Sequence, residues 1–317
     1  MYDLVSIGEI LVDLTPAGAE PDGRVLYQAN PGGAPANVAC AAARFGLKTA
    51  FIGAVGEDAF GRLCLAALKK AGVETAWATV LPGKATTLAA VGLDETGDRS
   101  FAFYRGGTAD LELSLEQLPA GLGRLTRALH FGSLSLSAEP ARTATLKAAK
   151  EVRTAGGLVS FDPNYRDMVW PSLDEARKRI EAAAPLARVL KLSREDGQVL
   201  FGTGEPEEIL RRAGDKFDSL LVIVTLAEAG CLAAFGGRVL AAPAFKLRVV
   251  DTTGAGDAFV GGLLKGLLAR DRLDDFPAAE MQSVLAFANA AGSLTVTKRG
   301  AISALPDLDD VRRLLKK

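Results

Sequence analysis

Residues 251–257 combine a glycine-containing turn with an acidic side chain, a pattern suited to transferring a charged group to a hydroxyl. The segment reads Asp-Thr-Thr-Gly-Ala-Gly-Asp, follows an apolar pair and leads into an apolar run at 258–264. Glycines let backbone N–H groups approach an anion closely, and the first turn of a helix adds unpaired N–H groups with partial positive charge. The segment therefore predicts a site for a phosphate or an oxyanion.

Asp257 is the unexpected member of this segment, because a carboxylate repels a bound phosphate. Its presence is explained if it accepts the proton of a hydroxyl that attacks the phosphorus. The alternative is that Asp257 only favours the start of a helix after a glycine turn. This segment alone does not decide between the two.

A second glycine-containing segment, residues 30–46, begins Asn-Pro-Gly-Gly-Ala-Pro-Ala-Asn. Pro35 suits the first turn of a helix, which the alanines after it propagate and a later glycine ends. Gly32 and Gly33 would expose backbone N–H groups just before this helix. Asn37, in its first turn, offers both a donor and an acceptor to a polyhydroxylated ligand. Close packing of the helix against a neighbour is the alternative.

Residues 4–14 form an apolar run that closes near Asp13. The run predicts a buried strand, and ligands of open α/β sheets bind at the carboxyl ends of strands. Asp13 is therefore a candidate for binding a ligand, with a turn residue at the strand end as the alternative.

Strands and helices alternate along most of the chain. Apolar runs predict strands at 48–53, 128–131, 158–161, 189–192 and 220–225, and helical patterns fall at 58–71, 140–155, 256–269 and 277–297. Apolar strands that alternate with helices predict an α/β fold with a mostly parallel sheet covered on both faces.

The segments 86–93 and 99–104 break this alternation, because they are short, rich in Thr, Val and Phe, and joined by the turn-like residues 94–98. They predict a hairpin, and 24–29 predicts a further strand of the same kind. We expect one domain over 1–317 with a small inserted sheet, whose lid segments are about 14–30 and 85–108.

Composition excludes several classes of protein. The formal net charge is −1 and no block of Lys or Arg occurs, which argues against nucleic-acid binding and against a polybasic membrane patch. The chain has three cysteines and one histidine, too few and too scattered for a zinc site. No basic leader and no bilayer-length apolar run is visible, so a cytoplasmic location with reduced thiols is expected.

The two glycine motifs, in this order and with a hairpin between them, resemble the two signatures of the ribokinase-like (PfkB) sugar kinases. The resemblance covers the whole chain. It implies a three-layer α/β sandwich with a β lid, and ATP-dependent phosphorylation of a small alcohol, usually a sugar or a nucleoside. The chain has no GxxxxGK(S/T) loop, which fits because this family binds nucleotide without one.

The resemblance implies a role for each matching residue. Asp257 matches the catalytic base. The other matches are Gly254, Ala255 and Gly256 for a backbone anion hole, Asp13, Gly32, Gly33, Asn37, Arg105 and Arg166 for the sugar, and Asn164, Lys191, Thr225, Gly230 and Asn289 for the nucleotide. Asp251 and Thr253 match a monovalent-cation site of some members, so K⁺ is a candidate ion beside ATP and Mg²⁺.

One position departs from the family pattern. The family often has Asn-x-x-Glu where this chain has Ser-Arg-Glu-Asp at 193–196. A serine there occurs in fructokinase-like members, but Asp196 is shorter than the usual glutamate. The sequence leaves open whether Asp196 or Glu195 helps to organise Mg²⁺ and its waters.

Within the family, the stretches 8–13, 103–105, 130–136 and 162–166 are most similar to bacterial fructokinases. The resemblance implies in-line transfer of the γ-phosphoryl group of ATP to the primary hydroxyl of fructose, which gives fructose 6-phosphate. Asp257 would take the proton and lid closure would exclude water. His130 is expected to be structural, because Asp257 already fills the role of base.

Two alternatives remain open. 2-Keto-3-deoxygluconate also offers a primary hydroxyl, and Arg105 could bind its carboxylate. Against it, residues 106–110 look more like a fructokinase, and 298–302 lack the acidic residue that keto-acid kinases tend to carry. The other alternative is a sugar-binding homologue without catalysis, against which the intact Asp257 and glycines argue. An exposed apolar face of the lid would favour a homodimer.

Overall fold

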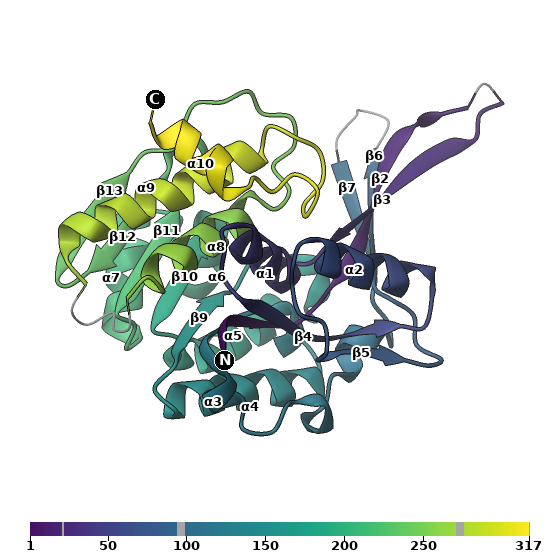
Figure 1. Ribbon diagram of the computed structural model, residues 1–317, viewed down its shortest axis with the longest axis horizontal. Coiled ribbons are helices and arrows are strands. Elements are labelled where there is room, and N and C mark those ends of the chain that lie inside the picture. The colour runs from purple at the N-terminus through teal and green to yellow at the C-terminus, as the bar shows by residue number, and fades with distance from the viewer. Residues whose placement is uncertain (21, 94–98, 271–275, 317) are drawn as a thin grey trace.

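The computed structural model describes residues 1–20, 22–93, 99–270 and 276–316. Within these ranges, one sheet has nine strands in the order β13-β12-β11-β10-β9-β8-β1-β4-β5, and a separate sheet has four strands in the order β3-β2-β6-β7. Figure 1 shows the small sheet extending away from one side of the main body.

The large sheet contains the strands that the apolar runs predicted. Its members are β1 (Tyr2–Ile7), β4 (Thr49–Gly56), β5 (Ala78–Leu81), β8 (Thr126–Gly132), β9 (Leu158–Asp162), β10 (Val189–Ser193), β11 (Leu221–Thr225), β12 (Cys231–Phe235) and β13 (Arg238–Ala242). Neighbours from β11 to β5 are parallel, whereas β12 and β13 are antiparallel. The prediction of a mostly parallel sheet is therefore confirmed.

Helices cover both faces of this sheet. They are α1 (Ala34–Arg44), α2 (Ala59–Lys70), α3 (Leu122–Leu125), α4 (Ala141–Thr154), α5 (Leu173–Ala183), α6 (Arg194–Phe201), α7 (Pro206–Lys216), α8 (Ala255–Leu267), α9 (Ala278–Thr295) and α10 (Leu308–Leu315). No helix within the described ranges is both long and apolar enough to cross a bilayer.

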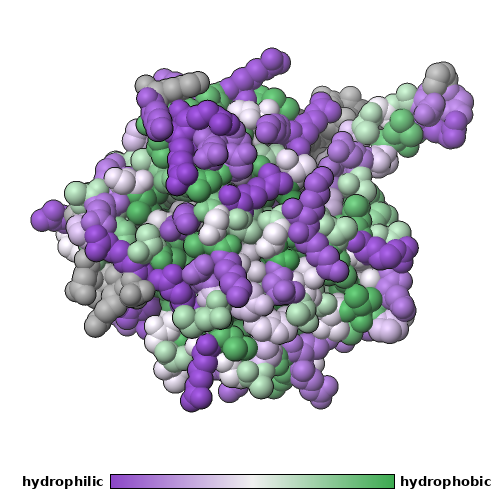
Figure 2. All heavy atoms as spheres, in the orientation of Figure 1, coloured by the Kyte–Doolittle hydropathy of each residue, from purple (hydrophilic) through white to green (hydrophobic). Residues whose placement is uncertain are grey.

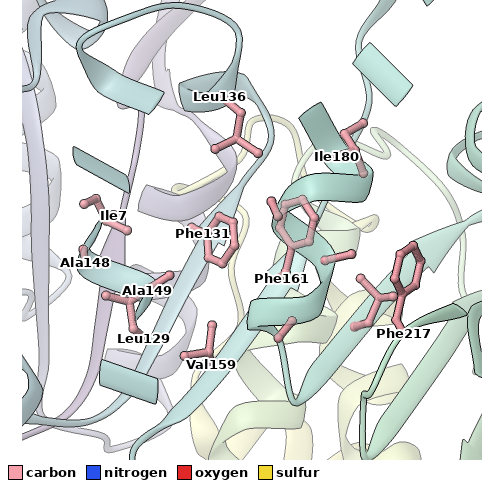
Figure 3. Packing of buried hydrophobic residues seen from close by; sticks show 14 of the residues in the cluster. Ile7, Leu129, Phe131, Leu136, Ala148, Ala149, Val159, Phe161, Ile180 and Phe217 are labelled. Atoms are coloured by element: carbon pink, nitrogen blue, oxygen red, sulfur yellow. The ribbon is translucent and has the colours of Figure 1, made fainter. Parts of the chain in front are cut away.

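The core divides between the two faces because successive strand residues point in opposite directions. Ile7, Phe131 and Phe161 face α4 and α5, and the rings of Phe131 and Phe161 stack with centroids 4.5 Å apart (Figure 3). Leu4 and Ile223, on the opposite face, pack with residues of α1, α8 and α9. The sheet is thereby a rigid platform for the loops at its strand ends.

The small sheet consists of β2 (Leu11–Ala19), β3 (Val25–Gly32), β6 (Leu88–Leu93) and β7 (Arg99–Tyr104). β6 and β7 pair antiparallel, which confirms the predicted hairpin, although its turn at 94–98 lies outside the described residues. β3 supplies the further strand that was predicted at 24–29 and continues to Gly32.

The prediction of one strand through residues 4–14 was wrong. β1 ends at Ile7, and β2 begins at Leu11 in the other sheet. Gly8 lies between them with φ +144°, and a Cβ there would stand 2.8 Å from Cγ of Pro35. The glycine therefore lets the chain change sheets against the start of α1. Asp13 consequently lies within the small sheet, paired with Asn30, and not at the end of a core strand.

Asp58 joins α2 to the segment that enters β6. Its Oδ1 accepts the Gly61 N–H at 2.7 Å and the Thr86 hydroxyl at 2.8 Å, and its Oδ2 accepts the Thr86 N–H at 2.7 Å. These hydrogen bonds outweigh burial and hold the pKa of Asp58 below its usual value. One side chain thus caps the helix and fixes the base of the small sheet.

We expect Asp58→Ala to lower the free energy of unfolding by about 2 kcal/mol, because it removes a helix cap and leaves the Thr86 N–H without its acceptor. Urea titration of the variant and of wild type measures the difference. Glu57→Ala, at the exposed neighbouring side chain, is the control and should change little. Equal losses in both variants would contradict the assigned role.

Candidate active site

Asp257 lies in the first turn of α8, where its carboxylate is 7% exposed. Its Oδ2 accepts a hydrogen bond of 2.7 Å from Nδ2 of Asn37, in the first turn of α1. The two glycine motifs, far apart in sequence, therefore meet through these side chains. Oδ1 of Asn37 is buried without a partner among the described residues, which leaves an acceptor beside the carboxylate.

The turn before Asp257 contains Gly254, Ala255 and Gly256, which were predicted to form a backbone anion hole. Gly254 caps α8 in the left-handed region with φ +78°, and a Cβ there would stand 3.2 Å from Cα of Ala301. The Ala255 N–H donates to the carbonyl of Thr252 at 3.2 Å. Across the described ranges, no partner is recorded for the N–H of Gly256, so this group is available to an anion.

A cluster of charged groups surrounds Asp257. Burial is the largest cause that raises the pKa of Asp13, to about 6, and the charges of Asp257 and Asp251 add to it, while Arg166 acts in the opposite direction. Burial also raises the pKa of Asp257, against the hydrogen bond from Asn37 and the charge of Arg166. Arg166 therefore offsets part of the repulsion between the carboxylates.

Close contacts require glycine, with no Cβ, at positions 32 and 33. A Cβ on Gly32 would stand 2.6 Å from Oδ2 of Asp13, and a Cβ on Gly33, where φ is +103°, would stand 2.7 Å from the carbonyl oxygen of Glu9. The glycines therefore bring the chain between β3 and α1 directly beside Asp13. Gly32 thus lies next to the predicted carboxylate, and Gly33 lies against the backbone of Glu9 and Ile10.

Glu9 was not predicted to belong to the site. Its Oε1 accepts the Ala34 N–H at 3.2 Å at the start of α1, and the side chain is buried. Burial is the main cause that raises the pKa of Glu9 to about 7. In the sequence, the only hint of a role for Glu9 was its position as an acidic residue within the apolar run 4–14.

Lys191 and Asp162 form a buried ion pair with 3.0 Å between Nζ and Oδ2. Burial alone would lower the pKa of Lys191, but the charges of Asp162, Asp196 and Asp257 raise it, so the ammonium stays charged. A Cβ on Gly256 would stand 3.5 Å from this Nζ, which places the cation beside the first turn of α8. In the sequence, the position of Lys191 inside an apolar strand indicated that it could have a function, because buried lysines are rare.

Three other predicted nucleotide residues lie around the ends of β11 and β13, whereas Asn164 lies in the loop after β9. The Thr225 hydroxyl donates to the carbonyl of Leu192 at 3.3 Å, and Nδ2 of Asn289 donates to the carbonyl of Ala242 at 2.9 Å. Gly230 has φ +98°, and a Cβ there would stand 2.1 Å from the same carbonyl oxygen. Their contact with a nucleotide stays a prediction.

Asp251 joins the turn before α8 to the loop that contains Gly300. Its Oδ1 accepts from the N–H and the hydroxyl of Thr253 at 3.0 and 2.7 Å, and its Oδ2 accepts the Gly300 N–H at 3.0 Å. An oxygen-rich turn with one carboxylate fits a monovalent cation. Within the described ranges no group of three or more His, Cys, Asp or Glu side chains could hold a metal ion.

Arg105 contacts other protein groups with each guanidinium nitrogen. Nε donates to Oδ2 of Asp110 at 2.7 Å, and the two terminal nitrogens donate to the hydroxyl of Ser137 at 2.8 Å and to the carbonyl of Leu134 at 3.0 Å. The side chains of this ion pair are 8% and 1% exposed. Direct contact of Arg105 with a sugar stays a prediction.

His130 is buried in β8, with Nδ1 3.1 Å from the hydroxyl of Ser160. Burial, with the charge of Lys191, lowers its pKa to about 3. The imidazole is therefore neutral, as expected for a structural side chain.

The chain is similar to known proteins over almost its whole length. The model of the pfkB family of carbohydrate kinases matches residues 1–308. Fructokinase-1 of Zea mays is 40% identical over 319 residues, which covers 99% of this chain and 98% of the relative.

Two solved structures have the same fold over their full length. A double mutant of Vibrio cholerae O395 fructokinase, in its fructose-, ADP- and potassium-bound form, has a TM-score of 0.88 at 37% identity and covers 99% of this chain and 98% of that chain. Fructokinase of Xylella fastidiosa with bound ATP has a TM-score of 0.92 at 32% identity and covers 100% of this chain and 99% of that chain. The resemblance drawn from the glycine motifs is thus confirmed, and this chain belongs to the pfkB family of carbohydrate kinases.

Proposed function

We propose that this protein is a fructokinase, which transfers the γ-phosphoryl group of ATP to the primary hydroxyl of fructose. The observation that carries the proposal is the buried Asp257 carboxylate at the start of α8, hydrogen-bonded to Asn37 and adjacent to an available backbone N–H. The fructokinases of similar sequence and fold support fructose as the substrate.

In the proposed mechanism, Asp257 accepts the proton of the sugar hydroxyl while the hydroxyl oxygen attacks the γ-phosphorus and ADP leaves. Its raised pKa makes the carboxylate a stronger base than an exposed aspartate. Asn37 orients the carboxylate, while the Gly256 N–H and the nearby ammonium of Lys191 stabilise negative charge on the phosphoryl group.

Mg²⁺, when bound with ATP, neutralises phosphate charge. A site with few protein carboxylates fits this ion, because Mg²⁺ usually keeps waters and binds substrate phosphates. We further propose K⁺ beside Asp251 and Thr253, whose side chains join two loops at the start of α8. The charge of a cation there would partly offset that of the neighbouring carboxylates.

Asp13 and the backbone at Gly32 and Gly33 would bind the hydroxyls at the far end of the sugar. The small sheet that carries Asp13 would act as a lid within a single kinase domain. Figure 2 shows apolar side chains on the projecting part of this sheet, and Val25, Leu26 and Tyr27 of β3 are all exposed. We propose that this face pairs with a second copy of the chain, and that the enzyme is cytoplasmic.

2-Keto-3-deoxygluconate is disfavoured by the surroundings of Arg105. A carboxylate would need its guanidinium fork, but Nε and both terminal nitrogens already donate to Asp110, Ser137 and Leu134. Withdrawing Arg105 would leave the buried Asp110 without its ion-pair partner, which is costly.

The proposed function is tested by supplying ATP and Mg²⁺ with fructose, 2-keto-3-deoxygluconate, glucose or ribose, and measuring ADP release. We expect the highest kcat/KM with fructose, because the guanidinium fork of Arg105, the candidate for binding an acid sugar, already donates to protein groups. Mass analysis should place the phosphate on the primary hydroxyl. Faster turnover of the keto acid would transfer the assignment to it, and no turnover of any sugar would favour a binding protein.

Asp257→Asn should lower kcat for fructose by roughly 10² to 10⁴, because the amide keeps an acceptor for Asn37 but cannot take the proton. Calorimetry should find fructose binding within about twofold of wild type. Asp309→Asn, at an exposed aspartate in the first turn of α10, is the matched control. Near-normal turnover in Asp257→Asn would remove it from the role of base.

Asp13→Asn should weaken fructose use yet stabilise the ligand-free protein. The raised pKa means that the folded state is penalised by the ionised carboxylate, so removing the charge should add about 1–3 kcal/mol at pH 7.5. This gain is fully present above the folded pKa of about 6 and disappears as the pH falls toward 4, because wild-type Asp13 then becomes protonated. Urea unfolding measured across pH checks both the size and the sign.

Asp22→Asn, in the exposed connection between β2 and β3, serves as the control for that series. A loss of stability at pH 7.5 in Asp13→Asn, or a gain that grew as the pH fell, would contradict the assigned charge cluster.

A further inference from the structure

Asp196 occupies the position at which the sequence left the role of the acidic side chain open. It is 1% exposed, and its Oδ2 accepts the Ser193 N–H at 2.8 Å while its own N–H donates to the Ser193 hydroxyl at 3.1 Å. This reciprocal pair is a capping box at the start of α6, formed with an aspartate in place of the more usual glutamate or glutamine. One carboxylate oxygen is therefore used within the helix start.

The other oxygen of Asp196 holds a different segment. Oδ1 accepts the Tyr165 N–H at 3.0 Å, from the loop that follows β9. The same loop is held at its beginning by Asp162, whose Oδ1 accepts the Asn164 N–H at 3.1 Å, and Asn164 has φ +46°. A non-glycine residue in this conformation needs such support, because the left-handed region is disfavoured for L-residues.

This loop also carries Arg166, one of the residues predicted to bind the sugar. A terminal guanidinium nitrogen of Arg166 donates to the carbonyl of Tyr165 at 2.8 Å, so the side chain is tied to the residue that Asp196 holds. Its positive charge acts on both Asp13 and Asp257. The hydrogen bonds therefore run from α6, through the peptide of Tyr165, to Arg166, whose charge acts on the carboxylates of the site.

We propose that Asp196 is a positioning residue for sugar binding, which places Arg166 beside Asp13 and Asp257 by holding the peptide of Tyr165. The proposal rests on the proposed function for the identity of the sugar. A role in organising Mg²⁺ is the competing one, and the geometry disfavours it because both oxygens of the buried carboxylate already accept backbone N–H groups. The neighbouring Glu195 is exposed.

The test measures fructose binding by calorimetry in EDTA without nucleotide, where no metal-organising role can contribute. Wild type, Asp196→Ala, Arg166→Ala and the double variant form a cycle, and Gln198→Ala on the exposed side of α6 is the control. We expect Asp196→Ala to weaken binding by about tenfold and the double variant to bind no more weakly than Arg166→Ala, because both changes remove the same contact. Gln198→Ala should bind as wild type does.

Amide hydrogen exchange gives a readout that does not depend on the sugar. The Tyr165 N–H should exchange at least about tenfold faster in Asp196→Ala, because it loses its acceptor. Should Asp196→Ala not fold, Asp196→Asn enters the same cycle, since its amide oxygen can accept only one of the two N–H groups.

Unchanged fructose affinity in metal-free Asp196→Ala would overturn the proposal, as would losses that add in the double variant or unaltered exchange at Tyr165. Failure of the proposed function has a different signature, since wild type itself would then neither bind nor phosphorylate fructose. In that case the cycle is run with the sugar that the substrate panel identifies, and the same outcomes decide.

Discussion

The structure depends on holding carboxylates together where a phosphoryl group must also bind. Asp13 comes from the small sheet, and Asp251 and Asp257 come from the segment 251–257; burial and the repulsion of the other two carboxylates raise the pKa of Asp13. Lys191 and Arg166 supply the opposite charge. Holding such a cluster in place needs a rigid platform, and the nine-stranded sheet with helices on both faces supplies it.

Several parts of this arrangement could be predicted from the sequence because they depend on local rules. The pattern of apolar strands and helices predicts a parallel sheet, and two glycine-containing helix starts predict anion and polyol binding. Asp257 and Asn37 could each be chosen as functional. The hydrogen bond between them could not be predicted, because it joins residues that are 220 positions apart and depends on the packing of α1 against α8.

Other parts could not be predicted from the sequence, because tertiary contacts override the local sequence pattern. The run through Asp13 has the composition of one strand, but the chain changes sheets at Gly8, where a positive φ and the close approach of Pro35 favour glycine. The hairpin of β12 and β13 was also missed, although Gly236 and Gly237, with φ +57° and +72°, form the kind of two-residue turn that favours one. The protein partners of Arg105 could not be predicted either, since a sequence does not show that Asp110 and Ser137 would accept its hydrogen bonds, and its contact with a sugar stays a prediction.

The position of β1 has a consequence for how the protein is made. β1 lies between β4 and β8, and β8 ends at Gly132, so one edge of the first strand has no native partner until well over a hundred residues have left the ribosome. An apolar strand with an open edge invites pairing with other chains. The nascent chain is therefore most exposed to aggregation before β8 emerges, and a slow stretch of translation before that point would lengthen its dependence on chaperones.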